Sequence, residues 1–290
     1  MPDIAPYYAL RRQLKLGRWR GRRLATALRW GPQRLASAPV VFGNAMPKSG
    51  SHLIIQVLYG LTRLGPFVNP GQPPVNRWED NRNLSENAIL NNLHRMRPGD
   101  IGYGYIKARE PFLSALSRQG MATVFVYRDP RDVIVSHVFY ATEMYAGHGM
   151  HQYYSEVLET MEERINAAIQ GVDEPDSELS SVRVKYENYL GWLETPDILC
   201  MRFEDLTLTR DAAISRLLDY LESRGYQAGM GRDVDLSVLK GAIAPGRSGT
   251  FRKGQPGNWK EHFTPANKAL FKDVAGDLLI CLGYEQDDNW

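Results

Sequence analysis

The sequence is poor in cysteine and has no long apolar run. Its 290 residues include two cysteines, Cys200 and Cys281, which are too few for a disulfide scaffold and too far apart for a metal knuckle. No uncharged apolar segment reaches the roughly 18 residues that a transmembrane helix needs, and the charged N-terminus lacks the apolar core of a secretory signal. We therefore expect a chain that works in the cytoplasm, with both cysteines as buried thiols.

Positive charge is concentrated in residues 1–38, which hold nine basic side chains and only Asp3 as an acid. The whole chain has a formal net charge of +2, so the remainder is net acidic and gives no reason to expect a nucleic-acid partner. Apolar side chains recur through this basic arm at helical spacing: Leu10, Leu14, Trp19, Leu24, Leu28 and Trp30. Such an arm suits peripheral contact with an anionic membrane surface, while a solvated tail or a helix packed on its own domain is equally open.

From residue 39 onward, short apolar runs alternate with helical periods, which is typical of βαβ units. The predicted strands are Pro39–Gly43, Ile101–Ile106, Ala122–Tyr127 and Ile198–Phe203. The predicted helices are Ser51–Leu64, Pro111–Arg118, Pro130–Tyr145 and Thr209–Arg224, with further periods near 152–170, 180–194 and 265–282. The expected fold is a single α/β domain over residues 39–290, with a central, mostly parallel sheet flanked by helices.

A tight loop, Met46-Pro47-Lys48-Ser49-Gly50-Ser51, follows the first predicted strand and leads into an apolar helix. The first N–H groups of that helix and the positive end of its dipole suit an anion. Lys48 adds a full charge, and the two serines add hydroxyl donors. The loop resembles a Walker A motif, although Pro47 stands where that motif has a glycine before the lysine. A phosphate site is favoured, and an ordinary βα turn is the alternative.

A second cationic segment begins at Arg128, at the carboxyl end of a predicted buried strand. Asp129 is a natural helix N-cap, Pro130 fits the first helical position, and Ser136 lies two helical turns from the arginine. Ligands of open α/β sheets gather at this edge, where an arginine fork with a hydroxyl suits a terminal phosphate. Alternatively, Arg128 and Arg131 pair with Asp129 and Asp132 and only cap the helix.

A third basic segment, Phe251-Arg252-Lys253-Gly254, lies in a glycine-rich stretch. Two adjacent cations there can close over an anion, and Gly254 lets backbone N–H groups approach it. A basic loop taken alone is usually only solvated. This segment is a candidate anion site because it occurs together with the other two cationic segments.

Together these segments resemble the sulfotransferase family that takes sulfuryl groups from 3′-phosphoadenosine 5′-phosphosulfate (PAPS). Pro47–Ser51 is similar to the family's PKSGT loop, and Arg128 with Ser136 is similar to its arginine followed eight residues later by serine. Arg252–Gly254 matches its late R-K-G segment, and Phe203–Leu206 resembles its Y-E-D-L segment. The matches follow the family's order over roughly residues 40–285.

The resemblance implies a P-loop-like domain, no metal, and PAPS as donor with adenosine 3′,5′-bisphosphate (PAP) as product. The 5′-phosphosulfate would be held by Lys48 together with the backbone N–H groups of Ser49, Gly50, Ser51 and His52. The 3′-phosphate would be held by Arg128, Ser136, Arg252, Lys253 and Gly254. Leu53 stands where many relatives have tryptophan, so Phe203 or Phe251 would supply the adenine surface. Lys48 is the first catalytic candidate, because a preorganised ammonium stabilises charge on the leaving phosphate oxygen.

The family's usual histidine base has no counterpart here. Counting back from Arg128 leads to Tyr105 and Ile106. The candidates for taking the proton are Tyr105, Lys107, Glu110, Glu79 and Asp80, and of these Tyr105 and Lys107 are retained as catalytic residues. The alternative is an acceptor that needs little deprotonation. Both need a pKa well below the ordinary value of about 10. The side chains of His52 and His137 are expected to be structural.

The expected acceptor is a small molecule with a hydroxyl or amine, either apolar or lipid-like. Two stretches, residues 65–80 and 139–154, would flank the sulfuryl end of the donor, and their aromatic side chains suit such a molecule. The same aromatic residues could instead fill a core beneath long loops. The alternative function is that of a P-loop-like nucleotide-binding protein, either a magnesium-dependent kinase or a binding module with reduced catalysis. The family's dimer element is incomplete, so the oligomeric state stays open.

Overall fold

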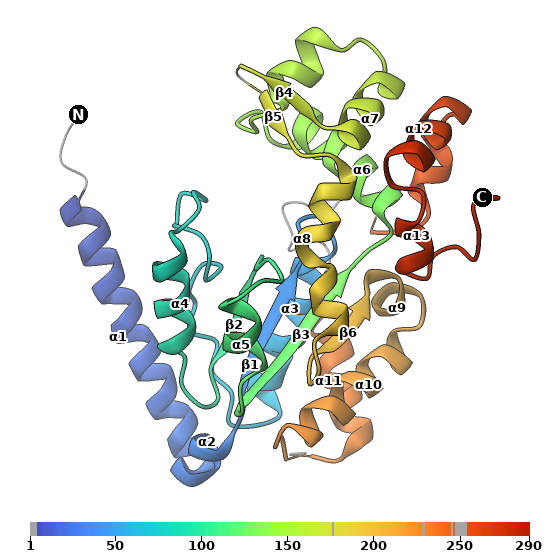
Figure 1. The fold of residues 1–290 in the computed structure, drawn as a ribbon. Helices are drawn as coiled ribbons and strands as arrows, with labels where there is room; N and C mark the ends of the chain where they lie inside the picture. Colours follow the sequence, from blue (N-terminus) through green and yellow to red (C-terminus); the bar gives the residue numbers. More distant parts are fainter. Residues whose placement is uncertain (1–4, 176, 228–229, 245, 247–253) are drawn as a thin grey trace.

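The structure is a computed structural model that describes residues 5–290 except 176, 228–229, 245 and 247–253, with the backbone alone over residues 5–12. Its centre is a four-stranded parallel sheet with the order β2-β1-β3-β6 (Figure 1). The strands are β1 (Val40–Ala45), β2 (Ile101–Gly104), β3 (Met121–Tyr127) and β6 (Leu199–Arg202). All four predicted strands are present, and the α/β fold class is confirmed.

Helices cover both faces of the sheet because its strands are apolar on both sides. Alternate residues of β1 enter opposite cores, with Phe42 on one face and Val41 on the other. The first core includes α5 (Phe112–Ser117), α6 (Pro130–Phe139), α7 (Met161–Gln170), α8 (Val182–Glu194) and α12 (Pro265–Ala275). The second includes α3 (Ser51–Gly60), α10 (Arg210–Ser223) and α11 (Arg232–Gly241). The result is a three-layer arrangement.

Other elements flank this centre. They are α1 (Ala5–Trp30), α2 (Pro32–Ser37), η1 (Leu61–Arg63), α4 (Glu86–His94), the π-helices η2 (Tyr140–Met144) and η3 (Tyr153–Val157), the strands β4 (Val172–Glu174) and β5 (Ser177–Leu179), α9 (Phe203–Leu208), η5 (Asn258–Glu261) and α13 (Leu278–Cys281). Strands β4 and β5 pair antiparallel in a sheet of their own.

The structure departs from the predicted elements in several places, and the strand predicted to reach Ile106 ends at Gly104. Phe203, predicted to end a strand, is the first residue of α9. The helix predicted to reach Tyr145 changes at Tyr140 into the π-helix η2. Helices α4 and α11 were not predicted, although Ser85 provides a helix-start signal by accepting a hydrogen bond from the N–H of Ala88.

Helix α1 packs on the rest of the chain through polar contacts. The indole Nε1 of Trp19 donates to Asp100 Oδ1 at 2.9 Å, and Arg23 forms an ion pair with the same carboxylate at 2.8 Å. The interpretation of the basic arm as a helix that contacts its own domain is therefore correct. Within the described part of the chain, no helix combines the length and the apolar character that crossing a bilayer requires.

The two cysteines differ in their surroundings. Cys200 is partly buried, its Sγ donates to the carbonyl of Trp192 at 3.3 Å, and burial raises its pKa to about 11. Cys281 is exposed at the end of α13, so the expectation of a buried thiol is wrong there. Leu279 and Leu282 face the core, while Cys281 and its neighbour Ile280 are turned outward.

Candidate active site

A cavity of about 530 Å³ lies at the carboxyl edge of the sheet, beyond the ends of β1 and β3. Its wall includes the β1–α3 loop, the start of α6, part of α9 and the segment Gly254–Asn258. Ligands of open α/β sheets bind at this edge, and the volume is in the range of small-molecule and nucleotide sites. The cationic motifs at Lys48 and Arg128 thus meet at one cavity, and Gly254, the described residue of the third motif, lies in the same wall.

The β1–α3 loop takes a strained, compact path into helix α3. Lys48 has a φ of 69° and Gly50 a φ of 92°, both in the left-handed region. A Cβ atom at Gly50 would come within 2.5 Å of the Phe203 ring, so glycine is required there both by conformation and by space. The loop brings the start of α3, from Ser51 to Leu53, to the cavity wall, and the positive end of a helix dipole favours an anion.

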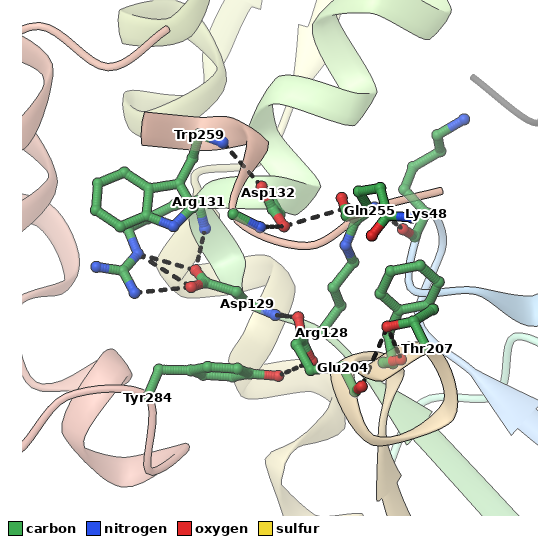
Figure 2. A network of polar contacts seen from close by, with 12 residues as sticks. Lys48, Arg128, Asp129, Arg131, Asp132, Glu204, Thr207, Gln255, Trp259 and Tyr284 are labelled. Atoms are coloured by element: carbon green, nitrogen blue, oxygen red, sulfur yellow. Dashed lines mark hydrogen bonds and ion pairs between the residues drawn. The ribbon is translucent and has the colours of Figure 1, made fainter. Parts of the chain in front are cut away.

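Arg128 joins three segments around the cavity (Figure 2). Its guanidinium forms an ion pair with Asp132 at 3.1 Å and donates to the carbonyl oxygens of Lys48 at 3.5 Å and Gln255 at 3.4 Å. Its Cζ lies 4.4 Å from the centroid of the Phe203 ring. The charge that would bind a phosphate is therefore held in place from several sides.

Asp132 fixes the late loop to helix α6. Its fully buried carboxylate accepts hydrogen bonds from the N–H groups of Gly257 at 2.8 Å and Trp259 at 2.9 Å (Figure 2). These bonds hold the end of the Gly254–Trp259 segment beside Arg128. The sequence predicts Asp132 only as a helix-capping partner of an arginine, one helical turn after Arg128, and its hydrogen bonds to the late loop have no local signal.

The helix-capping interpretation holds for Arg131. Its guanidinium bonds Asp129 and Glu285 and stacks 3.9 Å from the centroid of the Trp259 ring. Asp129 also accepts from the N–H of Arg131 as the N-cap of α6. Burial raises the pKa of Asp129, while Arg131 opposes that rise. Arg128 faces the cavity and Arg131 holds the helix in place.

Several buried polar atoms at this edge have no hydrogen-bond partner among the described residues. They are Ser49 Oγ, Arg128 Nε, and both side-chain amide atoms of Asn258. Buried polar groups are normally satisfied, so this cluster indicates a polar ligand. Arg128 and Asn258 line the cavity directly. Ser49 is fully buried, but its neighbours Lys48 and Gly50 line the cavity.

Aromatic side chains dominate the other end of the cavity. The ammonium of Lys48 lies 3.7 Å from the centroid of the Tyr140 ring. Tyr103, Tyr105 and Tyr145 also line this end, and the guanidinium of Arg77 lies 5.4 Å from the Tyr105 ring. Lys48 therefore stands between a polar end, which suits phosphate, and an end of aromatic surface.

Tyr105 contacts the end of the β1–α3 loop through Ser51. Its hydroxyl lies 3.0 Å from Ser51 Oγ, and either oxygen could donate in this hydrogen bond. Asn76 supports the position through a bond from its amide to the carbonyl of Tyr105 at 3.2 Å and one from the N–H of Tyr105 at 3.0 Å. Each of the two hydrogen-bonded hydroxyls, of Tyr105 and Ser51, can accept one proton while it donates its own.

Two cavity histidines, His137 and His148, lie with their ring centroids 5.1 Å apart. His148 Nδ1 accepts the N–H of Met150 at 3.1 Å, so a neutral His148 carries its proton on Nε2. Burial, and after it the charge of Lys48, lowers the pKa of His148 and favours this neutral form. His148 is therefore arranged as a hydrogen-bond donor and not as a base. His137 lies against Tyr154, and burial lowers its pKa well below 6.5.

The structure brings most of the predicted site residues together. Lys48, Gly50, Ser51, His52, Tyr105, Arg128, Ser136, Phe203 and Gly254 line the cavity. Phe251, Arg252 and Lys253 lie outside the described residues. Phe203 is 6% exposed and packs against Gly50 and Arg128, so its ring supports them and leaves little surface for an adenine.

The other candidates for the proton acceptor lie elsewhere. Lys107 is exposed and does not appear in the described lining of the cavity. Glu110 accepts from Ser114, Glu79 pairs with Lys15, and Asp80 pairs with Arg82, all at exposed positions. Among the described residues, no group of three or more histidine, cysteine or acidic side chains is arranged to hold a metal ion.

Comparisons with known proteins agree with this geometry. The family model of the sulfotransferase domain matches residues 108–281, which is more than half of the chain. The chain therefore belongs to the sulfotransferase domain family, and sulfuryl transfer is the class of reaction that this membership supports. A comparison with curated proteins finds no match.

Solved structures with the same fold include two that bind PAP. A mouse sulfotransferase complexed with PAP superposes with a TM-score of 0.59 at 16% identity, covering 87% of this chain and 91% of that one. Retinol dehydratase in complex with androsterone and inactive cofactor PAP gives a TM-score of 0.55 at 14% identity, covering 85% and 83%. At these identities the likeness concerns the fold alone.

We predict that Asp132→Asn destabilises the protein by about 3–5 kcal/mol, because it leaves the buried Arg128 without its ion-pair partner. The same change weakens PAP binding by releasing the segment after Gly254 from helix α6. Urea unfolding and calorimetric titration with PAP measure the two effects. The control is Asp205→Asn, which removes a more exposed pair with Arg216 and costs at most about 1 kcal/mol. Equal losses in both variants would contradict the role of Asp132.

Proposed function

We propose that this protein is a PAPS-dependent sulfotransferase that acts on a hydroxyl or amine of an apolar or lipid-like small molecule. The observation that carries the proposal is the convergence of Lys48, Ser51 and Arg128 on one cavity whose other end is aromatic. A kinase of the P-loop type is disfavoured because the loop has Pro47 before its lysine. PAPS is the donor that family membership implies.

The residues at the polar end fit the two charged groups of PAPS. Lys48 and the first turn of α3 would hold the 5′-phosphosulfate, since an ammonium and helix N–H groups both favour an anion. Arg128, Ser136 and the segment Arg252–Gly254 would hold the 3′-phosphate. The unpartnered atoms of Ser49, Arg128 and Asn258 support this assignment, because a ligand with phosphate oxygens would satisfy the donors among them.

In the proposed transfer, the acceptor oxygen forms a bond to the sulfur while the bond from that sulfur to the 5′-phosphate oxygen breaks. The electron pair of the broken bond stays on the phosphate oxygen, where Lys48 stabilises the developing charge. The products are the sulfated acceptor and PAP. No metal ion is needed for this charge balance if Lys48 and the N–H groups of α3 supply the positive charge.

The proton of the acceptor must leave during the transfer. We propose a relay in which the Tyr105 hydroxyl accepts that proton and passes its own to Ser51 Oγ, while Ser51 gives its hydroxyl proton to the leaving phosphate oxygen. The relay forms no free tyrosinate, so it works without a base of the usual histidine type. The neutral His148 would donate to the acceptor or to a sulfuryl oxygen.

The acceptor end of the cavity combines aromatic surface with two polar groups. Tyr103, Tyr140 and Tyr145 suit an apolar or aromatic skeleton, and Arg77 and His148 suit a polar handle on it. Two of the structural neighbours contain androsterone and retinol, which are apolar alcohols. Contact of the basic arm with a membrane, where lipid-like acceptors reside, belongs to the same proposal.

The direct test is incubation with radiolabelled PAPS and a panel of apolar alcohols, phenols and amines. Wild-type protein should yield PAP and a labelled product without added magnesium. Lys48→Ala should reduce the rate by about 10²–10³-fold, the usual cost of losing one group that stabilises a developing oxyanion. Lys240→Ala, at an exposed ion pair with Asp211, should keep the wild-type rate. Tight PAP binding with no labelled product from any acceptor would instead indicate a binding module.

Tyr105→Phe should lower kcat by about 10²-fold or more, the range of a positioned proton-transfer group, and leave PAP affinity unchanged. Ser51→Ala should lower kcat comparably, and the double variant should lose little more than either single one, because both residues act in one relay. Tyr153→Phe, which lies outside the described cavity lining, is the control. Full turnover by Tyr105→Phe would remove the relay from the mechanism.

A further inference from the structure

Helix α1 faces its own domain with basic and aromatic side chains. Trp19 and Arg23 bind Asp100, Arg22 donates to the carbonyl of Asn69 at 2.7 Å, and Lys15 pairs with Glu79 at 2.6 Å. These contacts fix one face of the helix. They also reverse the usual arrangement of an amphipathic helix, in which the apolar face is the one that packs inward.

The opposite face of α1 presents leucines to the solvent. Leu14, Leu24 and Leu28 are 54%, 64% and 81% exposed, and their spacings of ten and four residues place them on one helical stripe. Gly17 and Gly21 lie within this stripe, and a Cβ atom at either position would meet no atom of the described chain within 4 Å. The described part of the protein therefore leaves this face uncovered.

The charges beside the stripe are all positive. Arg18, Arg20 and Arg29 are exposed and flank the leucines. The sequence of α1 contains no aspartate or glutamate, and after Asp3 the first acidic residue is Glu79. Exposed leucines flanked by arginines are typical of helices that lie in the plane of a membrane interface.

A second copy of the chain is a weaker candidate for this face. The spacing of Gly17 and Gly21 would allow two helices to approach closely. Such a pair would also bring the arginines of two acid-free helices together, and like charges at an interface are unfavourable. An anionic lipid surface reverses the sign of this interaction, since each basic residue near it contributes about 1 kcal/mol.

We propose that the outward face of α1 docks on an anionic lipid bilayer, with Leu14, Leu24 and Leu28 inserted at the interface and Arg18 and Arg29 at the headgroups. This inference deepens the proposed function and rests on it for its purpose. Glu79 ties α1 to the segment that supplies Pro74, Arg77 and Asn81 to the cavity wall. Docking thus holds the acceptor end of the site beside the membrane in which a lipid-like acceptor would dissolve.

The test is co-sedimentation of the full-length protein with vesicles of phosphatidylcholine, with and without phosphatidylglycerol. Wild-type protein should partition onto the vesicles that contain phosphatidylglycerol. The double variant Leu24→Ser/Leu28→Ser should bind them at least about tenfold more weakly, given the usual gain from burying a leucine side chain. Arg18→Gln/Arg20→Gln/Arg29→Gln should lose the preference for the anionic lipid.

Leu208→Ser is the matched control, because Leu208 is 66% exposed on α9 and lies away from the stripe. It should bind vesicles as the wild type does, and urea unfolding should show all variants equally folded. Equal sedimentation of wild type and the Leu24→Ser/Leu28→Ser variant would overturn the proposal. A dimer in light scattering that the leucine variant abolishes would assign the face to a second copy instead.

The vesicle assay contains neither PAPS nor acceptor, so its outcome is independent of sulfotransferase activity. Protein that binds vesicles but forms no sulfated product would contradict the proposed function and leave the docking surface in place. Protein that sulfates soluble acceptors but does not bind vesicles would contradict the docking surface and leave the proposed function in place.

Discussion

The ion pair between Arg128 and Asp132 is the constraint on which the site depends. Arg128 reaches the β1–α3 loop through the carbonyl of Lys48, and Asp132 reaches the late loop through the N–H groups of Gly257 and Trp259. Segments that are 80 and 127 residues apart in sequence are thereby held at one edge of the sheet. Both charges are buried, so the pair is stable only because these further hydrogen bonds complete it.

The polar end of the site could be predicted from sequence because its groups follow strands directly. Lys48 and Arg128 stand just after β1 and β3, and carboxyl ends of parallel strands meet at one edge. The side chain of Asn44 determines which of the residues after β2 reach the cavity, which no sequence pattern predicts. It binds both the N–H and the carbonyl of Ile106, so the chain leaves strand geometry after Gly104. Tyr105 consequently reaches the cavity, while Lys107 becomes exposed.

The remaining site residues depend on tertiary contacts that no local pattern shows. Arg77 and Asn81 come from an irregular loop without periodicity. The helical spacing of Asp132 from Arg128 predicts their ion pair, but nothing in the sequence predicts its hydrogen bonds to Gly257 and Trp259. The tautomer of His148 is set by one backbone N–H, that of Met150. For α1, the spacing predicted a helix with an apolar lining, yet only the ion pairs with Asp100 and Glu79 show that the leucines face outward.

The central claim is that Lys48 and Arg128 bind opposite charged ends of one nucleotide. Calorimetric titration of wild type and Arg128→Lys with PAP and with adenosine 5′-phosphate tests it directly. The substitution keeps a charge opposite Asp132 but removes the planar fork. The account predicts that PAP affinity falls at least about tenfold, while affinity for adenosine 5′-phosphate, which lacks the 3′-phosphate, is unchanged. An equal fall for both ligands, or none for either, would contradict it.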